Sequence, residues 1–390
     1  MLDIKQVRKD PQSIAEALQK KRYDFPLDEF VRLDSRRKEA DVRSQDLLAE
    51  RKKASKQIGA LIAQGKSVDE AKAEVNETLD RLLTELDAAV EEAKTVQQAL
   101  DELLMGTPNL PDAAVPDGVD EDDNEEILTW GTPPALSFEA KDHADLGEAL
   151  GQLDFELAGK ITGSRFSVMQ GQLAKLQRAL THFMLDLHTT RHGYTEVYVP
   201  FIVNSDSLYG TGQLPKFAED SFMLEGDSGY YLIPTAEVPV TNMLRDRIVE
   251  DTELGDAGMK FTAHTPCFRS EAGSYGRDTR GLIRQHQFEK VEQFVAVTPE
   301  GNASWEEMDR LIGNAEAFYQ SLNIPYNVVN IVSGELNDAA AKKYDLEAWF
   351  PSSRTHRELV SCSNCTDYQS RRLEIRYGAP QKGPEKTKSY

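Results

Sequence analysis

Between residues 75 and 103, apolar side chains recur at alternating spacings of four and three: Val75, Leu79, Leu82, Leu86, Ala89, Ala93, Val96, Leu100 and Leu103. This spacing is typical of a coiled-coil seam. The preceding segment keeps one row at seven-residue spacing, namely Leu33, Ala40, Leu47, Ala54 and Leu61. Residues 64–68 interrupt the pattern, and Ser67 is placed to cap a second helix. The pattern predicts an antiparallel two-helix arm over about residues 27–104.

Two later segments alternate with the period of a strand. Apolar or small residues occupy every second position of the first, and the second puts Phe288 and Phe294 on one face and Val291, Val295 and Val297 on the other. The connection holds Gly273, Gly276 and Gly281 with Arg277, Arg280 and Arg284. We therefore expect an antiparallel hairpin running from about Cys267 to Glu292 around an arginine-rich loop.

A further helix is predicted from Leu173 to Leu187, where apolar residues share one face. The segment Thr195–Pro200 follows, and it is expected to form a short strand. Because Pro cannot donate a ladder hydrogen bond, this strand belongs at a sheet edge.

Residues 107–134 hold five prolines and an acidic run from Asp120 to Asp123, which predicts a linker. The chain is thus divided into a helical unit at 1–106, an acidic, proline-containing linker at 107–134 and a main body at 135–390.

The formal net charge of −21 argues against nucleic-acid binding unless basic residues gather locally. They do so on the first arm helix: Arg36, Arg37, Arg43, Arg51, Lys52, Lys53 and Lys56. One interpretation is a solvated face paired with its acidic neighbour, and the other is a surface for a phosphate backbone. Screening over about 8 Å at physiological salt would let such a patch act in spite of distant negative charge.

The compartment is predicted from what the sequence lacks. No window approaches a transmembrane span, and the first ten residues lack the apolar core of a secretory signal, so we expect a cytoplasmic protein without a membrane partner. The cysteines are Cys267, Cys362 and Cys365, too few for a disulfide framework. Zinc would need about four ligands, so buried thiols are favoured over a zinc site.

The arginines of the hairpin carry the clearest chemistry. Their planar, permanently charged forks match phosphate oxygens, while nearby carboxylates could orient them, bind an amine or hold Mg²⁺. A solvated charged hairpin is the alternative. The hairpin therefore indicates a nucleotide site.

The segment Cys267–Glu292 resembles motif 2 of class II aminoacyl-tRNA synthetases, and in detail the seryl-tRNA synthetases; the resemblance covers nearly the whole chain. It implies an α+β fold: a class II antiparallel β-sheet flanked by helices, with an N-terminal coiled-coil arm. It also implies a serine-tRNA ligase that forms seryl-adenylate from L-serine and ATP with Mg²⁺, then transfers the seryl group to tRNA(Ser). The segment 173–200 resembles motif 1, which implies a homodimer, and tRNA(Sec) is a further candidate partner.

The resemblance also implies site residues. Arg269 and Glu271 would be catalytic; ATP would contact Arg269, Ser270, Glu271, Arg284, Phe288, Glu358, Leu359, Val360 and Ser361. Serine would be bound by Thr235, Ala236, Glu237, Arg269 and Glu292. Mg²⁺ would be held by Glu358 and Ser361, and the basic arm residues would bind tRNA. Without the resemblance, Thr235–Glu237 is a helix-capping pattern and Glu358–Ser361 an ordinary polar strand.

After Tyr377 the sequence departs from the family pattern, which would continue into a strand and the motif 3 helix. That region supplies a Ser for serine binding and an Arg for the γ-phosphate, and a site without this Arg is expected to lose much transition-state stabilisation. The simplest account is a shortened sequence of a complete enzyme. The alternatives are a non-catalytic tRNA-binding or regulatory paralogue and an enzyme that loads serine on a carrier protein.

Overall fold

A computed structural model describes residues 1–226, 229–272 and 280–378, and the chain divides into two compact units. The arm unit comprises Leu2–Gln19 and Tyr23–Thr107, and the main unit comprises Met1, Lys20–Arg22 and Pro108–Tyr390. No helix within the described ranges is long and apolar enough to cross a membrane.

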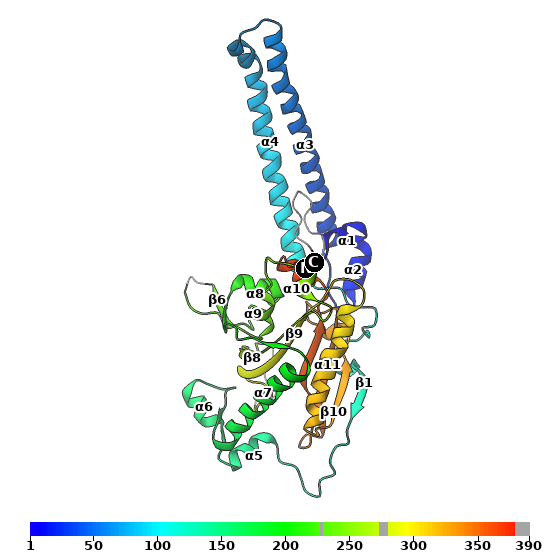
Figure 1. Cartoon of the computed structure of the whole chain (residues 1–390), viewed down its shortest axis with the longest axis vertical. Helices are drawn as coiled ribbons and strands as arrows, with labels where there is room; N and C mark the ends of the chain where they lie inside the picture. Colours follow the sequence, from blue (N-terminus) through cyan, green and yellow to red (C-terminus); the bar gives the residue numbers. More distant parts are fainter. Residues whose placement is uncertain (227–228, 273–279, 379–390) are drawn as a thin grey trace. The chain divides into compact units, whose positions relative to one another are not determined.

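The arm unit is helical. Its elements are α1 (Ile4–Lys9), α2 (Pro11–Gln19), α3 (Leu27–Ala63) and α4 (Val68–Met105). Helices α3 and α4 lie side by side along their length (Figure 1), so the predicted antiparallel arm is confirmed. Ser67 caps α4 as expected, because its hydroxyl accepts from the Glu70 N–H while the Glu70 carboxylate accepts from the Ser67 N–H.

The seam between the two arm helices is largely the predicted one. Leu82, Leu86 and Val96 are among its buried members. At its end, however, the seam differs from the prediction. Leu103 was expected to be buried but is only partly buried, and Leu104 is fully buried instead. The spacing of four from Leu100 to Leu104 is that of a straight helix, whose period is 3.6 rather than 3.5 residues.

The main unit mixes helices with mostly antiparallel strands. The strands are β1 (Glu125–Trp130), β2 (Leu153–Asp154), β3 (Val168–Met169), β4 (Thr195–Glu196), β5 (Ile202–Asn204), β6 (Tyr230–Leu232), β7 (Ile248–Val249), β8 (Met259–Phe268), β9 (Gln287–Ala296), β10 (Tyr326–Asn330), β11 (Lys342–Phe350), β12 (Thr355–Asn364) and β13 (Arg376–Tyr377). The helices are α5 (His143–Ala149), α6 (Phe155–Ile161), α7 (Gly171–Arg191), α8 (Ser205–Thr211), α9 (Glu237–Asn242), α10 (Asp251–Leu254), α11 (Ala303–Ser321) and α12 (Tyr368–Arg372), with 3-10 turns at Glu121–Asp123 and Ser333–Glu335.

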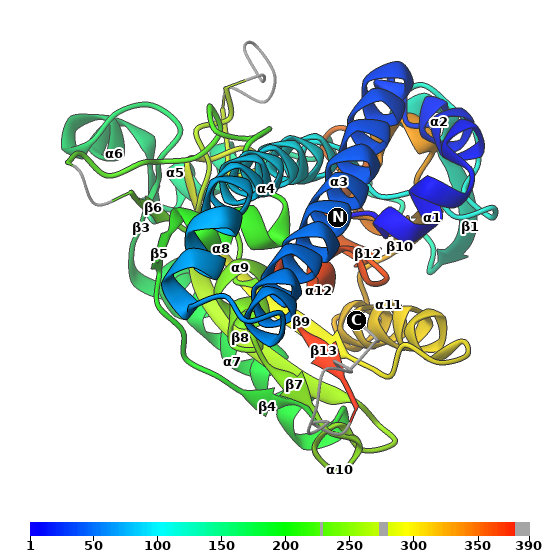
Figure 2. The same cartoon turned by 90° about the horizontal axis from the view of Figure 1, so that it is seen from above.

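Two sheets carry the main unit. One has the strand order β1-β10-β11-β12 with antiparallel neighbours, and the other has the order β4-β8-β9. Helix α11 contacts β9, β11 and β12, so it packs against strands of both sheets (Figure 2). The predicted α+β class with an antiparallel sheet is therefore confirmed.

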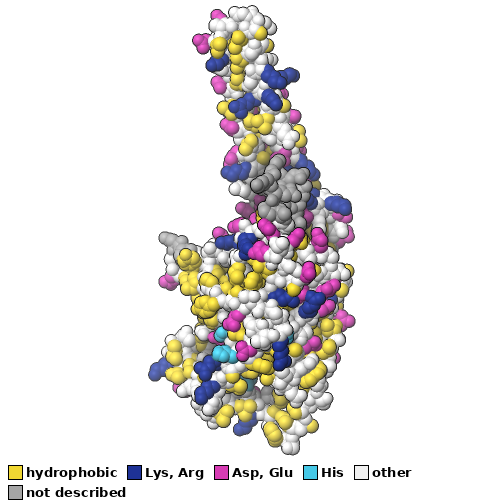
Figure 3. Space-filling model, viewed as in Figure 1, with side chains coloured by type: hydrophobic (Ala, Val, Ile, Leu, Met, Phe, Trp, Pro, Cys, Tyr) yellow, Lys and Arg dark blue, Asp and Glu magenta, His cyan; other side chains and the backbone are white. Residues whose placement is uncertain are grey.

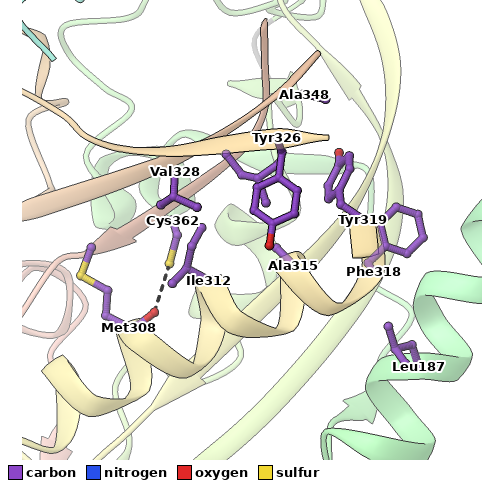
Figure 4. Packing of buried hydrophobic residues seen from close by; sticks show 11 residues of the cluster. Leu187, Met308, Ile312, Ala315, Phe318, Tyr319, Tyr326, Val328, Ala348 and Cys362 are labelled. Carbon is purple, nitrogen blue, oxygen red and sulfur yellow. Dashed lines mark hydrogen bonds between the residues drawn. The ribbon is translucent and has the colours of Figure 1, made fainter. Parts of the chain in front are cut away.

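The core beneath α11 is aromatic and aliphatic. Tyr326 on β10 is fully buried, and its hydroxyl accepts from the Gln320 side chain at 2.8 Å. Met308, Ile312 and Phe318 of α11 pack in the same cluster. The Cys362 thiol of β12 lies 3.8 Å from the Met308 carbonyl oxygen, to which it donates (Figure 4).

Two predictions need correction. The strand expected at Thr195–Pro200 is shorter, since β4 covers only Thr195–Glu196, although the Val197 N–H still donates to the Thr262 carbonyl. Residues 107–134, expected to be a linker, contain the edge strand β1, which pairs with β10. In β1, Thr129 and Glu126 hydrogen-bond the Asn327 side chain, which anchors the strand in spite of its acidic start.

The packing of α4 predicts a large difference between two adjacent leucines. Leu82 is 3% exposed and Leu83 is 40% exposed. Replacing Leu82 with Ala should destabilise the arm by about 2–5 kcal/mol, because it removes buried methyl groups and leaves a cavity. Leu83→Ala is the matched control and should cost less than about 0.5 kcal/mol. Hydrogen exchange of α3 and α4 amides measures both, and equal protection in the two variants would contradict the seam.

Candidate active site

The register of the β8–β9 hairpin determines which side chains meet. Cys267 pairs with Phe288, Thr265 with Lys290 and Ala263 with Glu292, as the predicted antiparallel hairpin requires. Because side chains alternate along a strand, Phe288, Lys290 and Glu292 point to one face of β9. Residues 273–279, which include Gly273, Gly276 and Arg277, lie outside the described residues.

A short connection brings Thr235 to this face. The Phe268 N–H donates to the Ile233 carbonyl at 2.9 Å, so the segment before α9 runs beside the end of β8. The Thr235 hydroxyl then donates to the Glu292 carboxylate at 2.8 Å. It also accepts from the N–H of Glu237, the first residue of α9, at 3.2 Å, while the N-cap of that helix is Ala236. Thr235 therefore contacts both the start of α9 and Glu292.

Glu237 and Glu292 form a mostly buried carboxyl pair. Burial raises the pKa of Glu237, and the charge of Glu292 raises it further. The Glu237 carboxylate accepts from the Gln369 side chain at 2.6 Å, and Gln369 is itself fixed by donating to the Thr211 carbonyl. For Glu292, burial acts in the same sense, but Lys290, Thr235 and Arg269 outweigh it and lower the pKa. The pair thus combines a stabilised carboxylate with one that is costly to ionise, an arrangement suited to a cation.

Lys290 supplies a cation to this pair in the structure. Its ammonium lies 2.7 Å from the Glu292 carboxylate and 2.5 Å from the Thr235 hydroxyl. Sequence reasoning missed both Lys290 and Gln369. The alternation of β9 could have found Lys290, because it lies between Phe288 and Glu292 on one face. Gln369 gave no signal, since it comes from α12, far along the chain.

Arg269 and Phe288 lie together beside the pair. The Arg269 guanidinium carbon is 5.1 Å from the centre of the Phe288 ring, and its Nε donates to the Pro234 carbonyl at 3.3 Å. Its backbone N–H donates to the His286 carbonyl, which continues the hairpin. Arg269 is exposed at its surface. A fixed guanidinium above an aromatic face is suited to phosphate and a flat ring.

The residues after Arg269 form a constrained turn. Glu271 has a φ of 54°, a left-handed conformation that side-chain-bearing residues rarely adopt. Its carboxylate accepts from Arg284 at 2.9 Å. The Ser270 N–H donates to the Asp220 carbonyl at 2.9 Å, and its hydroxyl donates to the Glu219 carbonyl at 2.5 Å. The predicted pair Glu271 and Arg284 is thus brought together.

Arg280 forms ion pairs with acidic residues in and next to α5. It lies 2.5 Å from Asp145 and 3.1 Å from Glu148, both in α5, and 3.7 Å from Asp142. These contacts tie the end of the hairpin loop to α5.

The segment Glu358–Ser361 lies on β12. Glu358 pairs with Glu347 and Val360 with Leu346, so Leu359 is an extra residue in a bulge and is half exposed. Glu358 and Ser361 are exposed, and Val360 packs against the core under α11. The Ser361 hydroxyl donates to Asp345 at 2.5 Å. Burial and then the charge of Glu358 raise the pKa of Asp345 to about 6, although Lys343 lies 2.9 Å away and acts in the opposite sense.

The charge of Glu292, from the carboxyl pair, acts on the Cys362 thiol of β12. Burial raises the pKa of the Cys362 thiol to about 12, with further contributions from Asp345 and then Glu292. Ala236 is fully buried and is the N-cap of α9. Within the described part of the chain, no group of three or more His, Cys, Asp or Glu residues is arranged to hold a metal ion.

The basic residues of the arm fall into two groups. Arg36 pairs with Glu92 at 3.1 Å, and Arg37 pairs with Asp41 at 2.5 Å and with Asp34. The second group consists of exposed residues with no ion pair to any described residue: Arg43, Arg51, Lys52, Lys53 and Lys56. In Figure 3, Lys and Arg side chains (dark blue) lie along the arm among acidic ones.

Two family descriptions match the chain. Residues 1–111 match the "Seryl-tRNA synthetase N-terminal domain", and residues 221–387 match the "tRNA synthetase class II core domain (G, H, P, S and T)". A serine-tRNA ligase of Alcanivorax borkumensis is 56% identical over 384 residues, which cover 98% of this chain and 88% of that protein. A serine-tRNA ligase of Hahella chejuensis is 51% identical over 383 residues, again 98% and 88%.

Two solved structures have folds similar to that of this chain. The crystal structure of seryl-tRNA synthetase from Pyrococcus horikoshii complexed with ATP is 36% identical, with a TM-score of 0.90, and the similarity covers 99% of this chain and 89% of that one. A cytoplasmic serine-tRNA ligase from Naegleria fowleri in complex with AMP is 33% identical with a TM-score of 0.87, covering 97% and 88%.

Proposed function

Because the chain belongs to the family of seryl-tRNA synthetases, we propose that the cluster of Thr235, Glu237 and Glu292 binds the ammonium group of L-serine while ATP lies against Arg269 and Phe288. The activity of the family is that of an aminoacyl-tRNA ligase acting on serine, with ATP as a substrate. The observation that carries the site assignment is the hydrogen bond from Thr235 to Glu292 beside the Glu237 carboxyl.

The carboxyl pair suits a small substrate that carries one positive charge. Ionised Glu237 and Glu292 repel each other in a mostly buried site, and an ammonium between them relieves that repulsion. Ala236 lends no side-chain group but holds Thr235 and Glu237 at the start of α9. A pocket that offers hydrogen-bonding groups also rejects analogues that leave those groups unpaired.

ATP is assigned to the end of the hairpin. The adenine would stack on Phe288, and the exposed Arg269 guanidinium, held 5.1 Å from that ring, would reach both the α-phosphate and the serine carboxylate. The Glu271 carboxylate and the Arg284 guanidinium lie 2.9 Å apart. Glu271 would accept a hydrogen bond from the edge of the adenine, and Arg284 would donate to a phosphate oxygen. Ser270 would contribute its backbone carbonyl, because its N–H is bonded to Asp220 and its hydroxyl to Glu219.

In the reaction, a serine carboxylate oxygen attacks the α-phosphorus of ATP, and pyrophosphate leaves. This step needs positioning and neutralisation of negative charge rather than covalent participation of the protein. Arg269 would supply a fixed charge at the reacting atoms. The seryl group would then pass to the terminal adenosine of the tRNA.

Mg²⁺ is assigned to Glu358 and Ser361 on β12, with Leu359 and Val360 contributing backbone beside ATP. The donors fit this ion, since both Glu358 and Ser361 offer exposed oxygen atoms. Two protein ligands are enough for Mg²⁺ when nucleotide phosphates and water complete its shell. The ion would supply neutralisation of phosphate charge.

We assign tRNA binding to the arm unit, with tRNA(Ser) as the partner and tRNA(Sec) as a second candidate. The exposed residues Arg43, Arg51, Lys52, Lys53 and Lys56 of α3 form no ion pair with any described residue. Contacts of this kind bind phosphate backbones and recognise the shape of the RNA.

We also propose a homodimer and a cytoplasmic location. The second copy would cover α7 and the segment after β4, where Leu176, Tyr198 and Ile202 are 53%, 87% and 48% exposed. Within the described residues Cys267, Cys362 and Cys365 are free, which suits a reducing compartment.

The ammonium pocket predicts opposite behaviour for two glutamates of β9. Glu292→Gln should raise KM for serine in ATP–pyrophosphate exchange by about 100-fold or more, because an ionic partner of the ammonium is lost. Glu289→Gln is the matched control, since Glu289 lies on the other face and pairs with His264 at 2.8 Å. KM for ATP should change little in either variant. An unchanged serine KM in Glu292→Gln would overturn the assignment.

The arm predicts a separation of binding from activation. Replacing Arg51, Lys52, Lys53 and Lys56 with Ala should weaken tRNA binding and reduce its salt dependence, with a slope smaller by up to about 3. Serine-dependent ATP–pyrophosphate exchange should stay unchanged. The control replaces Lys72, Arg81 and Lys94, exposed on the acidic α4, and should have the smaller effect. Equal loss of tRNA binding and exchange would contradict this division of labour.

A further inference from the structure

Lys290 occupies the place that the proposed function gives to the substrate ammonium. Its Nζ contacts the Glu292 carboxylate at 2.7 Å and the Thr235 hydroxyl at 2.5 Å. Both atoms are also those assigned to the ammonium of serine, so this inference rests on the proposed function. In this structure, an ammonium group of the protein itself thus contacts the Glu292 and Thr235 acceptors.

The two ammonium groups compete for the same acceptors. The Glu292 Oε2 atom already accepts from Thr235 and lies against Lys290, while Thr235 also accepts from the Glu237 N–H. A substrate ammonium at Thr235 and Glu292 therefore has to displace Lys290 from these atoms. Lys suits such an exchange, because its charge is carried by a flexible four-carbon stem.

The strand geometry indicates where the displaced ammonium goes. On one face of β9, Lys290 lies between Phe288 on one side and Glu292 on the other, with successive positions about 7 Å apart. The proposed adenine platform and the proposed serine pocket therefore flank it. With the substrates placed as proposed, the bond between serine and the α-phosphate would form between these two positions. Arg269 is a second cation there, since it lies over Phe288 and its charge acts on Glu292.

We propose that Lys290 is a further catalytic residue: its ammonium holds the serine pocket when serine is absent, and the arriving substrate moves it onto the serine carboxylate and α-phosphate oxygens. It remains protonated and transfers no proton. Its role is to add positive charge where the attacking oxygen and the leaving pyrophosphate carry negative charge. Serine binding thereby releases a charge that the activation step uses.

Lys260 of β8 forms an ion pair that differs from the pair of Lys290 with Glu292, because it lies away from the pocket. Lys260 lies 3.0 Å from Glu307, which is 4% exposed and also pairs with Arg310, and none of these groups touches the pocket. Lys290 instead shares its two partners with a substrate and keeps 31% of its side chain exposed. Lys260→Met is therefore the control for a lysine whose loss affects stability alone.

The test is the effect of Lys290→Met on serine-dependent ATP–pyrophosphate exchange by the full chain. Met keeps the length of the side chain and removes the competing charge. We expect KM for serine to fall by about tenfold, because serine no longer displaces an ammonium. We expect kcat to fall by about 100-fold, because the charge released toward the phosphate is gone. Lys260→Met should leave both parameters unchanged.

Lys290→Arg gives the opposite sign for serine binding and remains informative if the Met variant does not fold. The guanidinium of an arginine binds the Glu292 carboxylate more firmly than the ammonium of Lys290 does, so serine displaces it less readily. KM for serine should therefore rise, while part of kcat is retained because the positive charge remains. The inference is wrong if Lys290→Met raises KM for serine or leaves KM and kcat unchanged. If Glu292→Gln also leaves the serine KM unchanged, the pocket assignment fails; if Glu292→Gln loses serine binding, only the role of Lys290 fails.

Discussion

The repulsion between Glu237 and Glu292 is the constraint around which the main unit is arranged. Two carboxyl groups in a mostly buried site are stable only when donors and cations face them. Thr235, Lys290 and Gln369 meet that need from the start of α9, from β9 and from α12. Three segments far apart in the sequence are thereby fixed around a space suited to one small cation.

The surrounding fold places these groups on one face of a sheet. The pairing of β8 with β9 fixes the shared face of Phe288, Lys290 and Glu292, and α11 packs behind β9 and β12. Local backbone strain is found at Glu271, with its φ of 54°, three residues after the end of β8.

The sequence predicted the elements that depend on local signals. A capping box determines the helix break at Ser67, and strict alternation determines the hairpin, so both could be predicted from the sequence. Strand β1 was missed because acidic and proline residues around Glu125–Trp130 masked a segment rich in strand formers. Gln369 was missed because its role comes from a contact with Glu237 that no local pattern encodes. Lys290 lies between Phe288 and Glu292 on one face of β9, so its position was predictable, but its contact with Thr235 was not.

The most direct test of the account is the pKa of Glu237, measured by NMR on a chain with ¹³C-labelled glutamate side chains, with and without L-serine. A bound ammonium stabilises the ionised carboxylate, so the account predicts a lower pKa for Glu237 in the serine complex than in the free chain. Glycerate, which lacks the amine, should not lower it. A pKa that serine leaves unchanged would contradict the claim that this pair holds the substrate ammonium.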